Sequence, residues 1–532
     1  MADFLFSGGI IIDGSGGPPF QADVLIRGDR IASIDADLAA HASPDVKWID
    51  CAGLTLAPGF IDSHTHSDLQ VLEGRTEKLR QGVTTEVVGN CGFSAYPPAR
   101  DPAELRSFAN GIFCGDDTWG WPSTEAYLRA IEDSRTANVA SLVGHGSLRI
   151  AIAGNRQGAV TESELRAMES LLGEALSAGA VGFSTGLMYA PGSSAPTDEL
   201  QRLCNTTAKF GGIYTSHIRS YFSELVDAVE EQLDLARRSG GRLQISHLQA
   251  VGANNWHLQA RAIDAIEQAR AEGIDVEFDC YPYVAGSSVL TQVLPQSALD
   301  GGLSALMAKL RNPAQRLTIR EETLRSIAWR WSDIHISSVG TERNLGAIGK
   351  SLEEISAERR REPVDAMLDL LLEEEGDANM LCFNQSIENL RASLSHPCAT
   401  IISDGFYVKG RPHPRLHGTF PLLLGTISRQ RGWLTLPEAV HKITGKPAAR
   451  YGLKGRGLLK PGCYADIVAF RADTIDSPAT YESPELDPIG IEFVYRNGRP
   501  ATYLGALRKG LFVENNSRMS IGFDPAEHHE SQ

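Results

Sequence analysis

The stretch PGFIDSHTHSDLQ, residues 58–70, joins an apolar run to two histidines. The apolar run ends at Asp62 and has the composition of a buried strand. His64 and His66 follow directly, and side chains two positions apart on a strand point to the same face. Such a pair is either two surface residues or half of a metal site, and the rest of the chain decides between the two.

Seven more segments change from apolar to polar in the same way. With the opening segment they make eight candidate strands: LAPGFIDSHTH (56–66), TTEVVGNCG (84–92), VASLVGHGSLR (139–149), AVGFSTGLMY (180–189), GIYTSHIRS (212–220), RLQISHLQA (242–250), DVEFDCYPY (275–283) and ATIISDGF (399–406). Amphipathic helical patterns lie between most of them, such as TESELRAMESLLGEALSAGA at 161–180. Eight strand–helix units in one domain predict an α/β fold, a (β/α)8 TIM-like barrel. The carboxyl ends of its strands face the active site, so polar residues there are placed for chemistry.

Both ends of the chain have a different texture. Alternating, glycine-rich β patterns occupy the first fifty residues and return in GRGLLKPGCYADIVAFRAD, residues 455–473. We therefore expect a small β-sandwich built from both termini, with an N-terminal part at 1–56 and a C-terminal part at 456–532. The barrel then occupies 57–455, with an insertion at about 284–398 over its mouth.

The bulk composition argues against several classes of function. The formal net charge is −16 and the pI is about 5.4, which opposes binding to nucleic acid or to anionic membrane surfaces. No apolar stretch approaches the roughly 20 residues that span a bilayer, and the N-terminus lacks the basic region of a signal peptide. The eight cysteines form no CxxC pair, which is typical of reduced thiols in a cytoplasmic protein. The oligomeric state stays open, with a homo-oligomer as one option.

Further candidate ligands stand at the ends of other predicted strands. Four residues share this position: Cys91 (second strand), His217 (fifth), His247 (sixth) and Asp404 (eighth). Together with the two histidines of the opening segment they converge above the barrel, because its strands are parallel. Imidazole and thiolate ligands suit zinc better than magnesium or calcium. The sequence therefore predicts a zinc site at the mouth of the barrel.

These motifs resemble those of a known family. The opening PGFIDSHTHSD is similar to the metal-binding motif of the amidohydrolase superfamily. The remaining motifs resemble its D-aminoacylase branch, the N-acyl-D-amino-acid deacylases: GNCGFS, GHGSLR, STGLMYAPG, SHIRS, ISHLQA, YPYVAGSS, SDGF and RPHPRLHGTFPLLLG. The resemblance spans nearly the whole chain, from DGSG at 13–16 to KPGCYADIVAF. It implies a zinc-dependent hydrolase that cleaves the linear amide bond of a small-molecule substrate, an N-acyl-D-amino acid or a related N-acyl compound.

The resemblance also implies how the metal is held. Cys91, His217 and His247 correspond to the ligands of a tightly held zinc. His64 and His66, together with Cys91, correspond to a second, weaker position. Related superfamily members bridge two metals with a carboxylated lysine at the end of the fourth strand, but the segment FSTGLMY of this chain contains no lysine.

The same resemblance implies catalytic and binding roles. Asp404 corresponds to the general acid and base, and it also contacts the second metal position. Tyr189 corresponds to a tyrosine that helps to hold the developing oxyanion. Arg415 corresponds to the arginine that grips the α-carboxylate of the substrate in a bidentate contact. Either Tyr281 or Tyr283 assists it, and Tyr283 is preferred.

One substrate-binding position departs from the family pattern. Acylases of this branch usually have a lysine two residues after the sixth-strand histidine, where this chain has Gln249. The loss of that cation favours a bulkier amide, or a substrate whose carboxylate is placed differently. His145, Arg149, Ser287 and Ser288 are further pocket candidates from their positions alone.

Two alternatives stand beside the hydrolysis of a linear amide. The first is hydrolysis of a cyclic amide, an ester or another carboxamide, or a deamination, on the same barrel. The absent fourth-strand lysine speaks against the hydantoinase and dihydroorotase types. The second alternative is a non-catalytic binding protein, which requires a broken metal site, whereas all six candidate residues are present.

Overall fold

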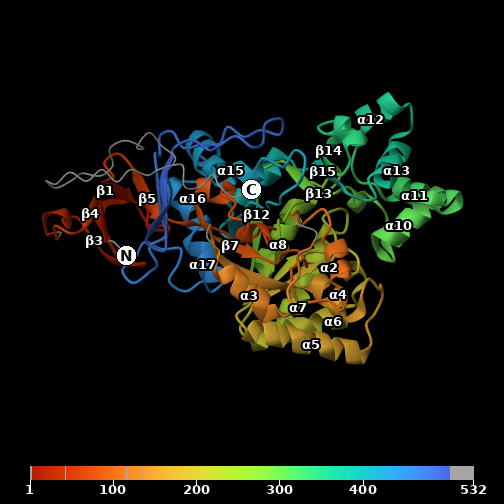
Figure 1. The fold of residues 1–532 in the computed structure, drawn as a ribbon, viewed down its shortest axis with the longest axis horizontal. Coiled ribbons are helices and arrows are strands. Elements are labelled where there is room, and N and C mark those ends of the chain that lie inside the picture. The colour runs from red at the N-terminus through yellow and green to blue at the C-terminus, as the bar shows by residue number, and fades with distance from the viewer. Residues whose placement is uncertain (1–2, 42, 116–117, 135, 504–532) are drawn as a thin grey trace.

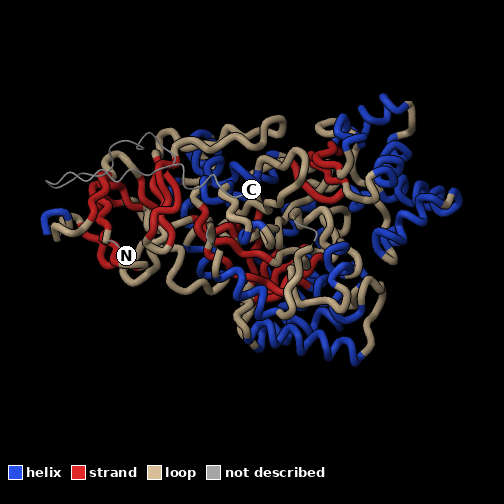
Figure 2. Tube along the Cα trace, viewed as in Figure 1, coloured by secondary structure: helices blue, strands red, loops and turns tan. Residues whose placement is uncertain are grey.

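The computed structural model describes residues 3–503 except residues 42, 116–117 and 135. Three parts follow one another across Figure 1: a sheet made from the two ends of the chain at left, a barrel in the centre and a largely helical part at upper right. Figure 2 shows the barrel strands with helices around them. The candidate metal ligands lie on the barrel, so its strands set the frame for the site.

Eight parallel strands form the barrel, and each overlaps one of the eight segments expected from the sequence. They are β6 (Phe60–Asp62), β7 (Val83–Val88), β8 (Asn138–Gly144), β9 (Gly182–Gly186), β10 (Ile213–His217), β11 (Arg242–Ile245), β12 (Val276–Cys280) and β16 (Ala399–Ile401). They are adjacent in this order in the sheet. A parallel bridge between Thr65 and Gly405 joins the two ends of the sheet. The predicted (β/α)8 barrel is therefore confirmed.

Amphipathic helices cover the outside of the barrel. The longest, α5, begins with a capping box in which Thr161 and Glu164 satisfy each other's backbone N–H groups. Helix α7 is followed by Gly240, whose φ of 65° is the left-handed conformation that glycine favours after a helix. The helices outside the insertion are α1 (Glu77–Arg80), α2 (Pro102–Phe108), α3 (Thr124–Glu132), α4 (His145–Ala153), α5 (Glu162–Ser177), α6 (Thr197–Lys209), α7 (Leu225–Ser239), α8 (Leu258–Ala271), α15 (Arg415–Leu422), α16 (Leu436–Lys442) and α17 (Gly445–Arg450).

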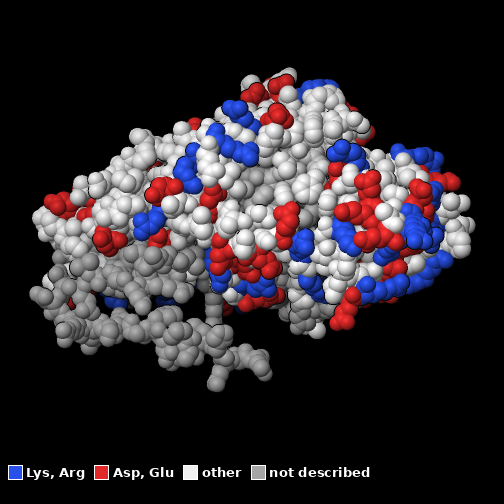
Figure 3. Space-filling view, turned by 90° about the horizontal axis from the view of Figure 1, so that it is seen from above, with Lys and Arg blue, Asp and Glu red and all other residues white. Residues whose placement is uncertain are grey.

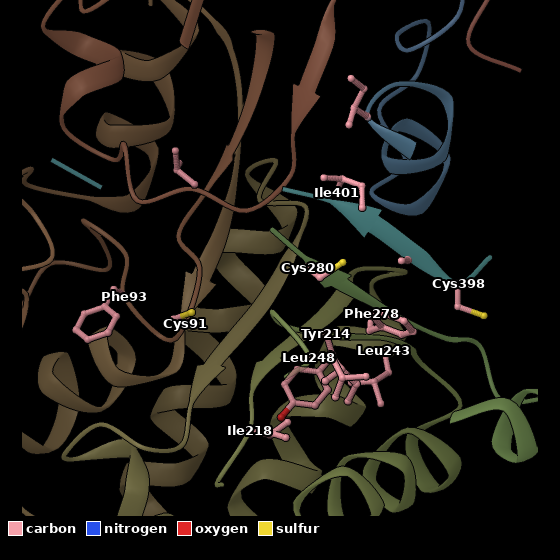
Figure 4. Close-up of a cluster of buried hydrophobic side chains, with 14 of the residues drawn as sticks. Cys91, Phe93, Tyr214, Ile218, Leu243, Leu248, Phe278, Cys280, Cys398 and Ile401 are labelled. Carbon is pink, nitrogen blue, oxygen red and sulfur yellow. The ribbon is translucent and has the colours of Figure 1, made fainter. Parts of the chain in front are cut away.

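The side chains of β10 show which face of a barrel strand looks inward. Tyr214 Oη donates to Gln232 of α7 at 2.6 Å, so Tyr214 points outward to the helices. Because side chains alternate along a strand, His217, three residues later, points to the inner face. Figure 4 shows Tyr214, Leu243 and Phe278 grouped on neighbouring strands. This packing fixes the strand ends that carry the candidate ligands.

A buried polar network ties the first barrel strand to the last. Lys78 of α1 donates to the Asp62 carboxylate and the Ser403 hydroxyl, and to Thr65 Oγ1 at 3.0 Å. The Ser403 backbone N–H donates to Asp62 Oδ1 at 3.0 Å. The Thr65 hydroxyl donates to the Gly405 carbonyl, also at 3.0 Å. We call Asp62, Thr65, Lys78 and Ser403, all of them buried, the closure network.

Between β12 and β16 the chain builds a separate sheet with helices. Its three strands pair antiparallel in the order β13-β15-β14. The elements are β13 (Ala285–Val289), α9 (Gln296–Leu299), α10 (Gly302–Arg311), α11 (Pro313–Ser326), β14 (Ile334–Val339), α12 (Leu352–Arg359), α13 (Pro363–Glu373), β15 (Ala378–Phe383) and α14 (Ile387–Ser395). Most of them enclose a separate apolar core, which includes Leu306, Met367 and Leu371, whereas Leu390 and Leu394 of α14 belong to the core of the barrel. The bounds of this insertion and of the three domains stay a prediction.

The two ends of the chain share one eight-stranded sheet. Its strands are β1 (Phe4–Ile11), β2 (Phe20–Arg27), β3 (Arg30–Asp35), β4 (Lys47–Asp50), β5 (Thr55–Pro58), β17 (Ile467–Phe470), β18 (Ile491–Arg496) and β19 (Arg499–Tyr503). Their order is β19-β18-β17-β5-β1-β2-β3, with β4 also paired to β1.

The shape of this sheet follows from the contact between Phe6 on β1 and Phe493 on β18. The two strands are three steps apart, about 14 Å in a flat sheet, at roughly 4.8 Å a step. Their ring centroids are nevertheless only 5.7 Å apart. The sheet therefore curls over an apolar core, and the predicted β-sandwich from both termini is confirmed. The last part of the expected segment 456–532, residues 504–532, lies outside the described residues.

The exposed surface carries acids and bases side by side. Figure 3 shows both kinds of side chain interspersed over the helical part of the molecule. Within the described residues, no helix is both long enough and apolar enough to cross a membrane. All eight cysteines are free thiols.

Candidate metal centre and active site

Six side chains from five strand ends meet at the mouth of the barrel. All are buried, and each ends or follows a barrel strand: His64 and His66 after β6, Cys91 after β7, His217 at the end of β10, His247 after β11 and Asp404 after β16. The structure thus brings together all six residues that the sequence pattern singled out as metal candidates.

The candidate ligand atoms of these side chains lie close together. Cys91 Sγ is 3.2 Å from His64 Nε2 and 3.5 Å from His247 Nε2. Asp404 Oδ1 is 3.4 Å from His66 Nε2. Three sets have all their ligand atoms within 4.8 Å of one another: His64–His66–Cys91, Cys91–His217–His247 and His64–His247–Asp404. Because Cys91 belongs to two sets, the centre offers two adjacent positions that share a sulfur atom.

Several buried nitrogen atoms of this centre have no hydrogen-bond partner. Among the described residues, these are both ring nitrogens of His217 and the Nδ1 atoms of His64, His66 and His247, whose Nε2 atoms face Cys91 or Asp404. Folded proteins leave few buried polar atoms unpaired, because each costs about 1–3 kcal/mol. Burial, helped by His247, lowers the pKa of His217 well below its usual value, so this imidazole is neutral, the form that binds metal ions. A neutral imidazole without partners, in one ligand set with the Cys91 thiol, fits zinc.

The backbone is strained at three of the six residues. Cys91, His247 and Asp404 have φ values of 52°, 33° and 50°, in the left-handed region that residues other than glycine rarely adopt. Each such residue costs on the order of 1–3 kcal/mol, and such strain is concentrated at functional sites. The loop of Cys91 packs against the end of β9, where a Cβ on Gly92 would lie 2.7 Å from the Gly186 backbone nitrogen.

Asp279 of β12 is a site residue that sequence reasoning missed. Its Oδ1 accepts the backbone N–H of His247 at 2.5 Å and lies 3.5 Å from His64 Nδ1. The carboxylate therefore positions two candidate ligands, one through its ring and one through its backbone. The available signal is an acid inside the strand VEFDC, because a charged residue is rarely fully buried unless it is paired.

A pocket adjoins the centre. Of the residues expected from the sequence, it is lined by Tyr189, Gln249, Tyr281, Ser287, Ser288 and Arg415, besides all the metal candidates except His64. Sequence reasoning did not single out Tyr221, whose ring lies 5.0 Å from that of His217 and 5.2 Å from that of His247. Met380 of β15 also lines the pocket, so the insertion forms part of its wall.

The structure places Tyr281 and Tyr283 differently. Tyr281 lines the pocket, where its Oη donates to Gln249 Oε1 at 3.0 Å and the Arg415 guanidinium lies 4.9 Å from its ring. Tyr283 does not line the pocket, and its Oη donates to the Pro414 carbonyl at 3.4 Å. The two tyrosines are two positions apart just after β12, beyond the regular strand, so alternation could not decide between them.

His145 and Arg149 also lie outside the pocket. The chain enters α4 immediately after β8, so both residues belong to a helix rather than to a strand end. His145 Nε2 is 2.7 Å from Glu199 Oε1, and Arg149 Nη1 is 3.5 Å from the same oxygen. All three side chains are buried, so they form an internal polar cluster instead of lining the substrate site.

Two protonation states bear on the chemistry of the pocket. Burial alone would raise the pKa of Asp404, but the Arg415 guanidinium, 2.9 Å away, and the neighbouring imidazoles hold it well below its usual value. Asp404 is therefore a carboxylate that can accept a proton. Burial raises the pKa of Tyr189, which keeps its phenol protonated and able to donate a hydrogen bond.

Comparison with known sequences identifies the family. The model of the Amidohydrolase family matches residues 47–502. D-aminoacylase of Alcaligenes xylosoxydans xylosoxydans is 37% identical over 505 residues, which cover 94% of each chain. N-acyl-D-glutamate deacylase of the same organism is 38% identical over 502 residues, which cover 93% of each chain.

Solved structures agree with the sequence comparison. A crystal structure of D-aminoacylase matches with a TM-score of 0.79 at 36% identity, covering 94% of this chain and 96% of that chain. N-acyl-D-glutamate deacylase from Bordetella bronchiseptica, complexed with zinc and a phosphonate mimic of the tetrahedral intermediate, matches with a TM-score of 0.81 at 35% identity and the same coverage. Fold and site together define a metal-dependent hydrolase rather than a binding protein. The chain belongs to the amidohydrolase family, and its resemblance to the D-aminoacylase branch is confirmed.

Proposed function

We propose that the enzyme removes the acyl group from an N-acyl-D-amino acid or a related N-acyl compound, with zinc as its cofactor. Cys91, His217 and His247 hold the tight zinc, and His64 and His66 form a weaker position that shares Cys91. The observation that carries this proposal is the convergence of Cys91, His217 and His247, whose ligand atoms lie within 4.8 Å of one another, with both ring nitrogens of His217 unpartnered among the described residues. Relatives with a zinc complex and with a binuclear metal centre support the choice of cofactor.

The residues of the pocket supply the acid–base steps. Zinc, when bound, polarises an amide carbonyl and lowers the pKa of a water molecule. Asp404, as a carboxylate, accepts the proton of the attacking water and later donates it to the leaving nitrogen. Tyr189 donates its hydroxyl hydrogen to the oxygen on which negative charge develops. Asp279 keeps His64 and His247 in place during these steps.

The charged side chains of the pocket indicate which class of substrate it can bind. Arg415 is the only lysine or arginine among the described residues that line it, and it is the proposed partner of the α-carboxylate. A second carboxylate on the substrate would be buried without a cation, which costs free energy. Gln249, held by Tyr281, adds a neutral amide. We therefore assign Tyr281 and Gln249, with Ser287, to substrate binding, and we expect a neutral side chain on the substrate.

The cellular setting follows from general properties. The eight free thiols support a reducing, cytoplasmic compartment. The net charge of −16 supports a small-molecule substrate rather than nucleic acid or an anionic membrane.

Metal analysis with a substrate panel tests the proposal. The purified enzyme should contain zinc and hydrolyse N-acetyl-D-amino acids with neutral side chains. It should be slower on their L-enantiomers, on N-acetyl-D-glutamate and on hydantoins. Chelation should abolish activity, and added zinc should restore it. Faster hydrolysis of hydantoins than of every N-acetyl-D-amino acid would reject the proposal.

A further inference from the structure

A second cavity, of about 90 Å³, adjoins the active-site pocket. The two share four lining residues: Ile112, Met188, Tyr189 and Gln292. The cavity lies between loops that follow the barrel strands on one side and the insertion on the other. Leu299 of α9 and Leu303 of α10 belong to the insertion side.

The lining of this cavity is mostly apolar and carries no charge, although Ser107, Asn110, Asn155, Thr291 and Gln292 add neutral polar groups. None of its described lining residues is an acid, a lysine, an arginine or a histidine. The ring of Phe93 stacks on that of Phe108 at 4.5 Å and meets the ring of Tyr189 edge-on at 5.0 Å. Val289 extends the apolar wall. Such a surface favours a hydrocarbon ligand, because burying apolar groups there removes them from water.

The catalytic residues decide which half of the substrate points toward this cavity. The leaving nitrogen must lie beside Asp404, which gives it a proton. Arg415 lies 2.9 Å from Asp404, so the amino-acid half of the substrate lies on that side. The acyl half therefore extends away from Arg415, past Tyr189, and Tyr189 borders the second cavity.

We propose that this second cavity binds the acyl group and that the preferred substrates carry an unbranched aliphatic acyl chain longer than acetyl. We call it the acyl cavity. The proposal rests on the proposed deacylase activity and adds the chemical class of the acyl group. The acetyl group would leave most of the cavity unfilled, whereas a longer chain would displace water from an apolar wall.

A chain-length series tests the acyl cavity. The substrates are one D-amino acid with a neutral side chain that carries acetyl, butanoyl, hexanoyl or octanoyl groups. Transfer of one methylene group into an apolar site is worth roughly fourfold in affinity. We expect kcat/KM to rise by about threefold to fourfold per methylene until the cavity is full, and then to level off. A flat or falling series would overturn the proposal.

A variant that fills the cavity tests whether the dependence of kcat/KM on chain length arises there. Leu303→Trp adds bulk at the cavity wall and should lower the octanoyl-to-acetyl ratio of kcat/KM by about tenfold or more, as several methylenes lose their site. Leu317→Trp, on the exposed face of α11 in the same insertion, is the matched control and should leave the ratio unchanged. If Leu303→Trp does not fold, Ser107→Phe at the exposed rim of the cavity serves the same purpose.

The failure of this inference differs from the failure of the proposed function. If no N-acyl-D-amino acid of any length is hydrolysed, the deacylase assignment is wrong. If all are hydrolysed but Leu303→Trp leaves the acyl series unchanged, the acyl cavity is wrong. If that variant instead changes the preference among amino-acid side chains at constant acetyl, the cavity binds the other half of the substrate, which also overturns the proposal.

Discussion

Two buried polar clusters lie side by side at the mouth of the barrel, and they are built on opposite principles. In the closure network, Lys78 donates to Asp62, Thr65 and Ser403, and Ser403 also donates to Asp62. In the metal centre, neither ring nitrogen of His217 has a hydrogen-bond partner among the described residues. One cluster is complete as the chain folds, and the other is not.

This difference in hydrogen bonding distinguishes polar residues that stabilise the fold from polar residues that bind a metal, although both kinds lie at the same rim of the barrel. Asp62 is only two positions from His64, and Ser403 is next to Asp404, so position in the chain does not distinguish the clusters. Pairing does. A buried charge with its partner in place needs nothing further, whereas a set of unpaired ligand atoms gains free energy when an ion binds. Variants in the metal centre should therefore lose metal or activity, whereas variants in the closure network should lose folding stability.

The largest expected effect is in the incomplete cluster. Cys91→Ala removes the atom shared by both metal positions, so it should lose the tight zinc and nearly all activity. His64→Ala, the matched variant, should lose only the weaker position. Elemental analysis of the purified proteins reads the metal content. Stoichiometric zinc in Cys91→Ala would contradict the ligand assignment.

Asp404→Asn should have the next largest effect. The amide keeps the shape of the side chain but accepts no proton, so kcat should fall on the order of 100-fold or more while the KM stays near its original value. The tight zinc should remain, because Asp404 is not among its proposed ligands. Steady-state kinetics with metal analysis check both points, and full activity would remove Asp404 from the mechanism.

Lys78→Met breaks the complete cluster and should act on stability instead. It leaves the Asp62 carboxylate buried without its cation, which should lower the free energy of unfolding by roughly 3–5 kcal/mol. The double variant Lys78→Met/Asp62→Asn removes the charge and should recover part of the loss. Urea denaturation of the metal-free proteins measures it. Unchanged stability with lost zinc would place Lys78 in the metal centre and break the distinction drawn above.

A smaller effect is expected at Arg415, which is paired with Asp404 like a residue of the closure network but also faces the substrate pocket. A charge-assisted hydrogen bond is worth roughly 1.5–3 kcal/mol, or about tenfold to 150-fold in kcat/KM. Arg415→Ala should cost that much more on an N-acyl amino acid than on the matching amide, which has no carboxylate.

Gln249→Lys provides the reverse test of the same contact. It adds a second cation beside Tyr281, so it should improve the acid relative to the amide by a few-fold, on the scale of a partly exposed ion pair. Rates on both substrates are needed for each variant. An equal loss on acid and amide in Arg415→Ala would show that the arginine has only a structural role.

Much of this architecture is predictable from the sequence, and there is a physical reason why the remaining features are not. The eight barrel strands and their polar ends were found because a buried strand and its exposed end differ in composition over several residues. The sequence does not show the partner of Lys78 or the role of Asp279, nor which of Tyr281 and Tyr283 lines the pocket. Each depends on which side chain is nearest in space, and a hydrogen bond between Lys78 and Ser403 leaves no local mark on either segment.

The positive φ angles at Cys91, His247 and Asp404 were equally invisible. A backbone conformation that costs free energy locally is maintained by the whole fold, so local propensity argues against it. His145 does follow strand β8 directly, as the motif GHGSLR predicts, but it begins helix α4 and its ring pairs with Glu199, a contact that the local sequence does not show.

The sheet made from both ends of the chain has a consequence for biosynthesis. Pro58 of β5 pairs directly with Ile467 of β17, about 400 residues later. A ribosome adds roughly 5–20 residues per second. The edge of β5 that pairs with β17 therefore stays unpaired for about 20–80 s, while the barrel between the two strands is translated. During that interval an unpaired apolar strand is open to pairing with other nascent chains. We expect co-translational folding of this protein to depend on a chaperone that covers β5 until the last strands emerge.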